Sequence, residues 1–160
     1  MTLLRLLNSK WSLKILTTFD NLALQTFLNL FEDFFLLCEG KAGTAEELLG
    51  ALPPTKGLED KTVLGIYEGP LLMGLLDLVQ DYPERGTWTI GYFIMHPAFR
   101  GQGIGDRFLQ DLSDALQSLG ALKLRCIVQH QNPRARLFWT NHGFVVKGQV
   151  DENFILEKSL

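Results

Sequence analysis

The amino-terminal part of the chain combines one short apolar run with apolar residues at helical spacing. Leu13 to Thr17 has the length and composition of a β-strand, and Asp20 stands where it can cap a following helix. We expect this helix to bury one face, because its apolar residues recur three and four positions apart. That apolar stripe consists of Leu24, Phe27, Leu28 and Phe31.

A second, shorter helix is expected before the strand-rich part of the chain. Thr44 followed by Glu47 matches a capping box, the pattern that begins a helix with reciprocal hydrogen bonds. Pro53 and Pro54 must end this helix, because proline has no N–H group to continue it. Residues 56–61 then form a polar loop.

From residue 62 the apolar period changes to two, which is the period of a strand. Turn-forming residues at 68–70 separate the run over 62–66 from the apolar residues of 71–79, so we predict a β-hairpin. Residues 87–95 are dense in β-branched and aromatic side chains and predict a third antiparallel strand. Pro97 ends it.

The last part of the chain predicts a parallel strand pair and two closing strands. Residues 105–119 form an amphipathic helix that Gly120 ends, and the apolar strand 122–128 follows. Strand, helix and strand in this order favour a parallel pair. Pro133 starts a helix that ends near Gly143, and the closing strands are 145–150 and 154–157.

These elements define an α+β fold. We expect a mixed, mainly antiparallel central sheet of about six to seven strands, flanked by helices. The length of 160 residues fits a single domain over residues 1–160 with one core.

Charge and composition exclude several classes of protein. The formal charge of -3 argues against a nucleic-acid partner, because non-specific affinity for phosphates comes from clustered Lys and Arg. Arg5 and Lys10 interrupt the amino-terminal apolar stretch, and Glu32 and Asp33 interrupt the longest apolar region. We therefore predict no signal peptide, no membrane span and no membrane partner, and a cytoplasmic location.

The cysteines do not indicate a metal or redox centre. Cys38 and Cys126 are too few for a disulfide framework and lack the spacing of a zinc or dithiol site. We expect both to be packing residues and predict no metal.

The most informative segment is a glycine-rich turn between a strand and a helix. Its sequence is Phe99-Arg100-Gly101-Gln102-Gly103-Ile104-Gly105. Glycines allow positive φ angles there, and the start of the following helix leaves N–H groups unpaired and carries partial positive charge. A phosphate or diphosphate is the natural ligand. The alternative is a turn of the same shape that binds nothing.

Two other phosphate-binding motifs fit the turn poorly. A nucleoside-triphosphate loop needs Lys and then Ser or Thr after its last glycine, but Asp106 and Arg107 follow Gly105. A dinucleotide-binding turn has G-x-G-x-x-G within a parallel sheet, whereas this chain has G-x-G-x-G after antiparallel hairpins.

The residues around the turn resemble the GNAT superfamily of acetyl-coenzyme A-dependent N-acyltransferases. Its diphosphate signature is Arg or Gln, two residues, Gly, one residue, then Gly or Ala, which matches Arg100, Gly103 and Gly105. The strand end Ile94-Met95-His96-Pro97 is also similar to the family pattern. A second family element looks like Asn132, Ala135, Phe138, Trp139 and the pair Gly143-Phe144. The resemblance covers roughly residues 86–145 and implies the acyl-CoA N-acyltransferase fold, with acetyl-CoA as the acetyl donor.

The resemblance also implies which residues contact coenzyme A. The strand at Ile94, Met95 and His96 would expose backbone groups to the pantetheine arm, where the parallel strand from Leu124 splays away. The diphosphate would bind the turn formed by Arg100, Gly101, Gln102, Gly103, Ile104 and Gly105. Asn132 would help to position the cofactor, and Phe138 and Trp139 would flank the thioester.

Transfer to an amine needs a neutral nucleophile, stabilisation of the developing oxyanion and a proton for the departing thiolate. No nucleophilic Cys or Ser signature is evident, so we expect direct attack in a ternary complex. A backbone amide near Ile94 or Met95 could polarise the carbonyl group. Of three carboxylates near the central strand, Asp77, Asp81 and Glu84, we choose Glu84 as the candidate base.

The general acid is not identified by the sequence. Many members of the family have Tyr four residues before the glycine of the Gly-Phe pair, where this chain has Trp139. An indole N–H cannot titrate near neutral pH, so Tyr92 or a water supplies the proton, or the thiolate leaves unassisted. His96 and His130 are further candidates for proton transfer, each with the alternative of an ordinary histidine at a strand end.

Three functions stay open at this stage. The leading one is acetylation of a primary amine on a small molecule or peptide. The acidic residues between Asp77 and Glu84 hint that the acceptor is cationic. The others are an acyl-CoA-binding sensor without turnover and a structural domain whose turn is empty. A homodimer formed through the closing strand 154–157 is also possible on the sequence.

Overall fold

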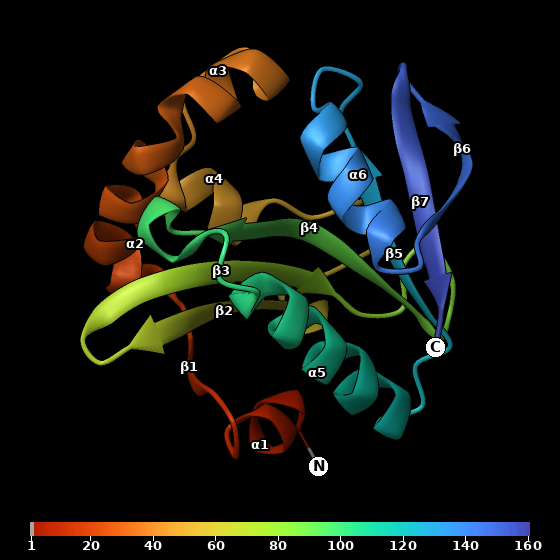
Figure 1. Cartoon of the computed structure of the whole chain (residues 1–160), viewed down its shortest axis with the longest axis horizontal. Coiled ribbons are helices and arrows are strands. Elements are labelled where there is room, and N and C mark those ends of the chain that lie inside the picture. The colour runs from red at the N-terminus through yellow and green to blue at the C-terminus, as the bar shows by residue number, and fades with distance from the viewer. Residues whose placement is uncertain (1) are drawn as a thin grey trace.

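The protein contains one sheet of seven strands with helices against both faces, seen in a computed structural model that describes residues 2–160 (Figure 1). The order across the sheet is β1-β2-β3-β4-β5-β7-β6. The strands are β1 Ser12–Ile15, β2 Lys61–Glu68, β3 Leu71–Val79, β4 Thr87–Met95, β5 Lys123–Val128, β6 Val145–Val150 and β7 Asn153–Ser159. The α-helices are α1 Leu3–Leu7, α2 Asn21–Leu28, α3 Glu32–Glu39, α4 Ala45–Gly50, α5 Ile104–Ser118 and α6 Pro133–Asn141. The 3₁₀ helices are η1 Thr18–Asp20, η2 Asn29–Phe31, η3 Leu58–Asp60 and η4 Pro97–Phe99.

The strand pairing confirms the predicted fold class. Only β4 and β5 run parallel among the described residues, and every other neighbouring pair is antiparallel. The parallel pair arises because α5 carries the chain from the end of β4 back to the start of β5.

Two hydrophobic clusters occupy the two faces of the sheet. On one face, α1, α5 and α6 contribute to a cluster in which Phe108, Leu112 and Leu116 of α5 are fully buried. On the other face, α2, η2, α3 and α4 cover a second cluster that includes Phe27 and Phe35. The predicted amphipathic helices therefore bury the faces that their sequences indicate.

β4 and β5 pair only over their first residues and then separate. Their partner pairs run from Thr87–Lys123 to Ile90–Cys126, although β4 continues to Met95 and β5 to Val128. Figure 1 shows the two strands diverging from this paired end. On its other edge β4 stays paired with β3 up to Met95, past a bulge that leaves Gly91 without a partner.

The bulge packs against a buried ion pair. The ammonium Nζ of Lys61 lies 2.9 Å from Oδ1 and 3.0 Å from Oδ2 of Asp77, and both side chains are almost inaccessible to solvent. Burial raises the pKa of the Asp77 carboxyl group, against the opposite effect of Lys61. A Cβ atom at Gly91 would lie 2.5 Å from Oδ2 of Asp77, so only glycine fits without moving the pair.

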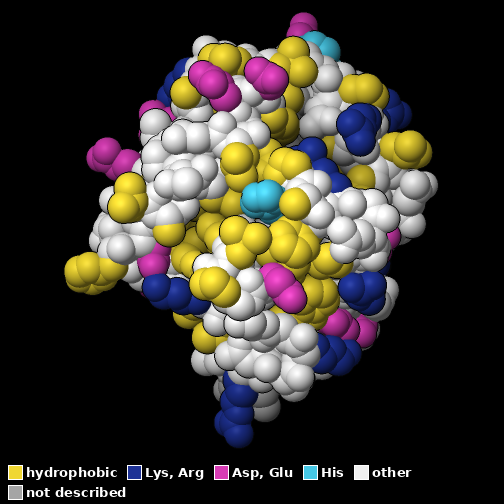
Figure 2. All heavy atoms as spheres, turned by 60° about the vertical axis from the view of Figure 1, so that its left-hand side comes forward, with side chains coloured by type: hydrophobic (Ala, Val, Ile, Leu, Met, Phe, Trp, Pro, Cys, Tyr) yellow, Lys and Arg dark blue, Asp and Glu magenta, His cyan; other side chains and the backbone are white. Residues whose placement is uncertain are grey.

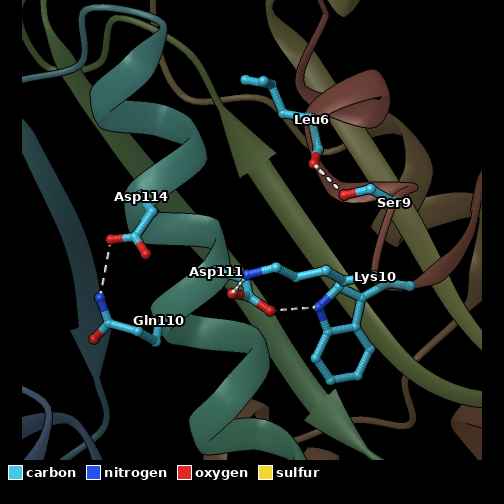
Figure 3. A network of polar contacts seen from close by, with 7 residues as sticks. Leu6, Ser9, Lys10, Gln110, Asp111 and Asp114 are labelled. Carbon is cyan, nitrogen blue, oxygen red and sulfur yellow. Dashed lines mark hydrogen bonds and ion pairs between the residues drawn. The ribbon is translucent and has the colours of Figure 1, made fainter.

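The amino-terminal segment is attached to α5 by a polar contact. Figure 3 shows Lys10 and Asp111 in this contact, with the Lys10 Nζ 2.7 Å from Asp111 Oδ1. The indole N–H of Trp11 donates to the other carboxylate oxygen at 2.9 Å, and its ring meets the edge of Phe108. Helix α1, which the sequence pattern did not predict, is held beside α5 in this way.

The structure differs from the sequence predictions at two helix starts. Asp20 does not cap α2, because its carboxylate accepts from the Thr17 N–H and pairs with Lys14. The helix predicted to carry Leu24 to Phe31 ends in the 3₁₀ helix η2, and α3, which was not predicted, follows without an intervening Gly or Pro. Thr44 does cap α4, since its hydroxyl accepts from the Glu47 N–H at 3.2 Å.

The closing strand β7 cannot serve as the dimer edge that its sequence suggested. It is hydrogen-bonded to β5 on one side and to β6 on the other, so β6 and β1 are the edges of the sheet. The oligomeric state stays a prediction without a proposed interface. Within residues 2–160, no helix has the length and apolar character needed to cross a membrane.

We predict that Gly91→Ala destabilises the protein by about 1–3 kcal/mol, because the added Cβ must displace a buried, paired carboxylate. Gly148→Ala is the matched control: it also lies at a bulge, and its Cβ would meet no atom within 4 Å. Its effect should stay within about 0.5 kcal/mol. Urea unfolding of the two variants measures the difference, and equal stabilities would contradict the role assigned to Gly91.

Candidate active site

The edge of β4 that faces β5 carries unpaired backbone groups. The His96 N–H donates to the Met73 carbonyl at 2.7 Å, which makes this a hydrogen-bonded pair of the β3–β4 ladder. Such pairs alternate in an antiparallel ladder, so Ile94 also bonds to β3, whereas Phe93 and Met95 turn their N–H and C=O groups toward the gap. Of the three residues predicted to expose backbone groups here, Ile94, Met95 and His96, only Met95 turns its N–H and C=O toward the gap.

A cavity of about 680 Å³ fills the gap between β4 and β5. Its walls include the outer part of β4, the start of α5, the aromatic side chains of α6, and Phe31 and Phe34 from η2 and α3. The last two residues were not predicted, because nothing in the local sequence shows that this segment crosses the gap. Figure 2, in which the side of α2 and α3 is turned forward, shows a hollow lined by hydrophobic side chains.

The glycine turn at one end of the cavity has the conformation that its sequence indicates. Gly101 and Gly103 have φ values of 74° and 73°, in the region that favours glycine. Gly103 precedes α5 as its N-cap without a side-chain cap. Within residues 2–160, the N–H groups of 101–106 make no hydrogen bond to another residue. They stand at the positive end of a 15-residue helix, which is an arrangement for binding an anion.

The side chains of the turn are directed away from these amides. Gln102 donates through Nε2 to the Ala98 carbonyl at 3.2 Å. The Arg100 Nε donates to the Met95 carbonyl at 3.2 Å, and its guanidinium lies over the ring of Phe31, 5.4 Å from the centroid. The Arg100 side chain therefore points toward η2.

Helix α6 closes another side of the cavity. Its N-cap is Asn132, whose side-chain oxygen accepts from the Ala135 N–H at 3.1 Å, so this residue lines the cavity and also starts the helix. Phe138 and Trp139, which the resemblance places beside the thioester, both line the cavity. Trp139 is buried between Phe93 and Phe144, which agrees with a packing role for its ring.

A contact between Asp106 and His142 joins the start of α5 to the end of α6. His142 Nε2 lies 2.9 Å from Asp106 Oδ1, and its Nδ1 lies 2.6 Å from the Phe138 carbonyl oxygen. Both ring nitrogens thus lie within hydrogen-bond distance of an oxygen atom, and His142 joins the two helices. Asp106 also lines the cavity, and His142 fixes its carboxylate beside the anion-binding amides.

Two lining residues carry a hydroxyl or thiol proton. Burial raises the pKa of the Cys126 thiol to about 12, which keeps it protonated at the point where the strands part. Burial and the hydrogen bond to Glu39 raise the pKa of Tyr92 well above its ordinary value. Tyr92 therefore stays protonated near neutral pH, and its hydroxyl donates to Glu39, whose side chain is exposed to solvent.

Several predicted residues lie outside the cavity. Glu84 forms an ion pair with Lys123 at 3.0 Å, beside the paired end of β4 and β5 and away from the gap, so it is not the base. Asp77 is held by Lys61, and Asp81 accepts the Gly86 N–H at 2.6 Å. The acidic residues that hinted at a cationic acceptor thus do not line the cavity.

The two histidines at strand ends are also outside it. His96 Nδ1 accepts from the Ala98 N–H at 3.1 Å and caps η4, and the His130 backbone lies near Asn153. Among residues 2–160 no three His, Cys, Asp or Glu side chains gather where they could hold a metal ion.

A split parallel pair with an anion-binding turn at its mouth defines a class of protein that binds an extended, diphosphate-containing ligand between two strands. Comparison of the chain with known proteins identifies this class. The model of the acetyltransferase (GNAT) family matches residues 24–144, so the chain belongs to this family, and it is an acetyltransferase. No curated protein sequence matches the chain.

Solved structures share this fold at low sequence identity. An acetyltransferase from Thermus thermophilus is 21% identical, with a TM-score of 0.77, and the match covers 93% of this chain and 96% of that one. The paiA N-acetyltransferase from Thermoplasma acidophilum, in complex with coenzyme A, is 18% identical over 93% and 98% of the chains, with a TM-score of 0.67. The ribosomal-protein-S18-alanine N-acetyltransferase from Escherichia coli is 14% identical over 92% of each chain, with a TM-score of 0.67.

We predict that His142→Ala weakens binding of coenzyme A, because the Asp106 carboxylate loses the partner that fixes it and then repels the diphosphate at the neighbouring amides. Like charges several ångströms apart repel by about 1 kcal/mol, so the dissociation constant should rise about 3- to 10-fold. The double variant His142→Ala/Asp106→Asn should recover most of this loss. Isothermal titration calorimetry measures both, and an unchanged affinity in the double variant relative to His142→Ala would reject the electrostatic explanation.

Proposed function

We propose that the protein transfers the acetyl group of acetyl-CoA to a primary amine by direct attack within a ternary complex. The observation that carries this proposal is the position of one free backbone N–H, that of Met95, in the same cavity as the unpaired amides of the glycine turn. Family membership supports an acyl-CoA donor, and the name of the coenzyme A complex among the structural relatives agrees with it.

The residues present fit coenzyme A. We assign the backbone amides of residues 101–105 and the positive end of α5 to its diphosphate. The backbone edge of Phe93 and Met95 is available to the amide groups of the pantetheine arm, and Asn132, Phe138 and Trp139 form the opposite wall. When bound there, the donor supplies an acetyl thioester in the gap between the two strands.

Met95 is assigned the polarising role. Its N–H donates to the thioester carbonyl oxygen as negative charge develops there, in a site walled by Phe93, Phe138 and Trp139. Because this donor belongs to a strand that is hydrogen-bonded to β3 on its other edge, it needs no reorganisation during the reaction.

Protons must balance in the transfer. A bond forms between the amine nitrogen and the acetyl carbon, the carbon–sulfur bond breaks, and one proton passes from the amine to the thiolate in sum. We assign Tyr92 to supply the proton that the leaving thiolate takes up, since it is the one phenol that lines the cavity within the described residues, and water to take up the proton that the amine loses. Its hydrogen bond to the exposed Glu39 connects it to solvent.

The proposal is tested by following thiol release from acetyl-CoA with a panel of amines. We expect coenzyme A to raise the melting temperature and at least one amine to give turnover. Tyr92→Phe should lower kcat by about 100-fold while leaving coenzyme A binding intact. Binding without thiol release from any amine would favour the sensor function, and no binding would reject both.

A second prediction isolates the Met95 donor. Met95→Pro removes an N–H that the β3–β4 ladder does not use, so the fold should persist while kcat falls by about 10²- to 10³-fold. Met95→Ala keeps the N–H and controls for loss of the side chain. The two kcat values and the coenzyme A affinities of both variants decide the point, because equal rates would exclude a role for this amide.

A further inference from the structure

A carboxylate borders the cavity at the hydroxyl of Tyr92. Tyr92 lines the cavity, and its ring packs against the second hydrophobic cluster, 5.7 Å from the ring of Phe35 in α3. Its hydroxyl donates to Oε1 of Glu39, the last residue of α3. The carboxylate is therefore held on the side of the sheet that α2, α3 and α4 cover, opposite the face that α5 and α6 cover.

Of the three carboxylates near this phenol within the described residues, two are already paired. Asp77, which lies opposite the phenol in the β3–β4 ladder, is held by Lys61 at 2.9 Å. Glu47 pairs with Lys41 at 3.1 Å. Glu39 is thus the carboxylate that meets a cation entering at this border of the cavity.

The cationic side chains that line the cavity lie elsewhere. Arg100 directly precedes the turn amides assigned to the diphosphate, and its guanidinium stacks on Phe31, just before α3 begins. Glu39 is at the far end of that helix, and seven residues of α-helix rise by about 10 Å. Arg134 is on the first turn of α6, which packs on the other face of the sheet. Positive charge therefore lies beside the donor, and negative charge lies beside Tyr92.

The helices around Glu39 add to the negative charge. Residues 32–50, which form α3, α4 and the loop between them, contain five Asp or Glu and one Lys. The last turn of α3, all of it described by the structure, has no Lys or Arg. The partial negative charge of the carbonyl groups at this helix end is therefore added to that of the Glu39 carboxylate.

The bond between Tyr92 and Glu39 places a bound cation at the reacting atoms. In the proposed mechanism Tyr92 protonates the leaving thiolate, so a cation on Glu39 lies one hydrogen bond away from the group that meets the sulfur. Such a cation is the reacting nitrogen itself. Alkylamines are mostly ammonium ions near neutral pH. The bound ion gives up one proton to water, and the neutral amine then attacks with the proton balance stated above.

We propose that Glu39 binds the acceptor as an ammonium ion beside Tyr92, and that the acceptor is an alkylamine and not a weakly basic arylamine. This inference rests on the proposed acetyl transfer and specifies its substrate class. Phe34, on the same helix as Glu39, lines the cavity and offers an apolar surface to the carbon atoms of the acceptor.

The test compares two isomeric acceptors that differ in basicity. Phenethylamine is an ammonium ion near neutral pH, whereas 4-ethylaniline is neutral. Glu39→Gln removes the charge, but its amide oxygen still accepts from Tyr92. We expect kcat/KM for phenethylamine to fall about 10- to 100-fold in this variant, chiefly through KM, as when a hydrogen bond to a charged group is lost. The kcat/KM for 4-ethylaniline and the KM for acetyl-CoA should change less than about threefold.

Glu46→Gln is the matched control. Glu46 is also an exposed carboxylate on the same side of the sheet, in the first turn of α4, but it does not contact Tyr92. It should leave both acceptors unchanged. Equal losses in Glu46→Gln and Glu39→Gln would show that only the general field matters, and the inference is wrong. It is also wrong if Glu39→Gln lowers kcat equally for both isomers, because Glu39 then only positions Tyr92.

A binding measurement keeps the inference separate from the proposed activity. In protein saturated with coenzyme A, phenethylamine should raise the melting temperature more than 4-ethylaniline does, and Glu39→Gln should remove the difference. This result supports recognition of the ammonium ion even if no thiol release occurs, which would count against the transfer reaction only. Equal shifts with the two isomers, or no shift with either, would overturn the inference whatever the activity.

Discussion

The structure depends on the separation of β4 from β5 after the pair Ile90–Cys126. Up to that point the two strands share a ladder, and beyond it the edge of β4 presents N–H and C=O groups to a cavity. Buried backbone groups without partners are costly, so this edge is stable only if water or a ligand satisfies them. The remaining β3 ladder, bulged at Gly91 and supported by the buried Lys61–Asp77 pair, holds the exposed edge in position.

Two kinds of donor thus meet in one cavity. The amides of the glycine turn are unpaired because a helix begins there. Those at the end of β4 are unpaired because β5 separates from β4 after Ile90. The turn amides suit an anion, and the edge of β4 suits an extended chain of amide groups. Together they match the diphosphate and the pantetheine arm of coenzyme A. The family membership agrees with this division.

Side chains at this site act through their neighbours. His142 holds the Asp106 carboxylate beside the anion-binding turn, Glu39 accepts from Tyr92, and Phe31 supports the guanidinium of Arg100. These partners are far apart in sequence, and several lie on η2, α3 and α6, so their effect depends on how helices from both sheet faces converge at one gap.

The sequence by itself determined the order of the strands, the helices α2, α4, α5 and α6, the parallel pair, the shape of the glycine turn and the family, because these depend on local periodicity and on motifs read along the chain. Only the tertiary structure decided that Glu84 pairs with Lys123 outside the cavity, that Met95 and not Ile94 faces the gap, and that Phe31 and Phe34 form its far wall. Strand register and the packing of distant segments are set by contacts between faces, which no local pattern encodes.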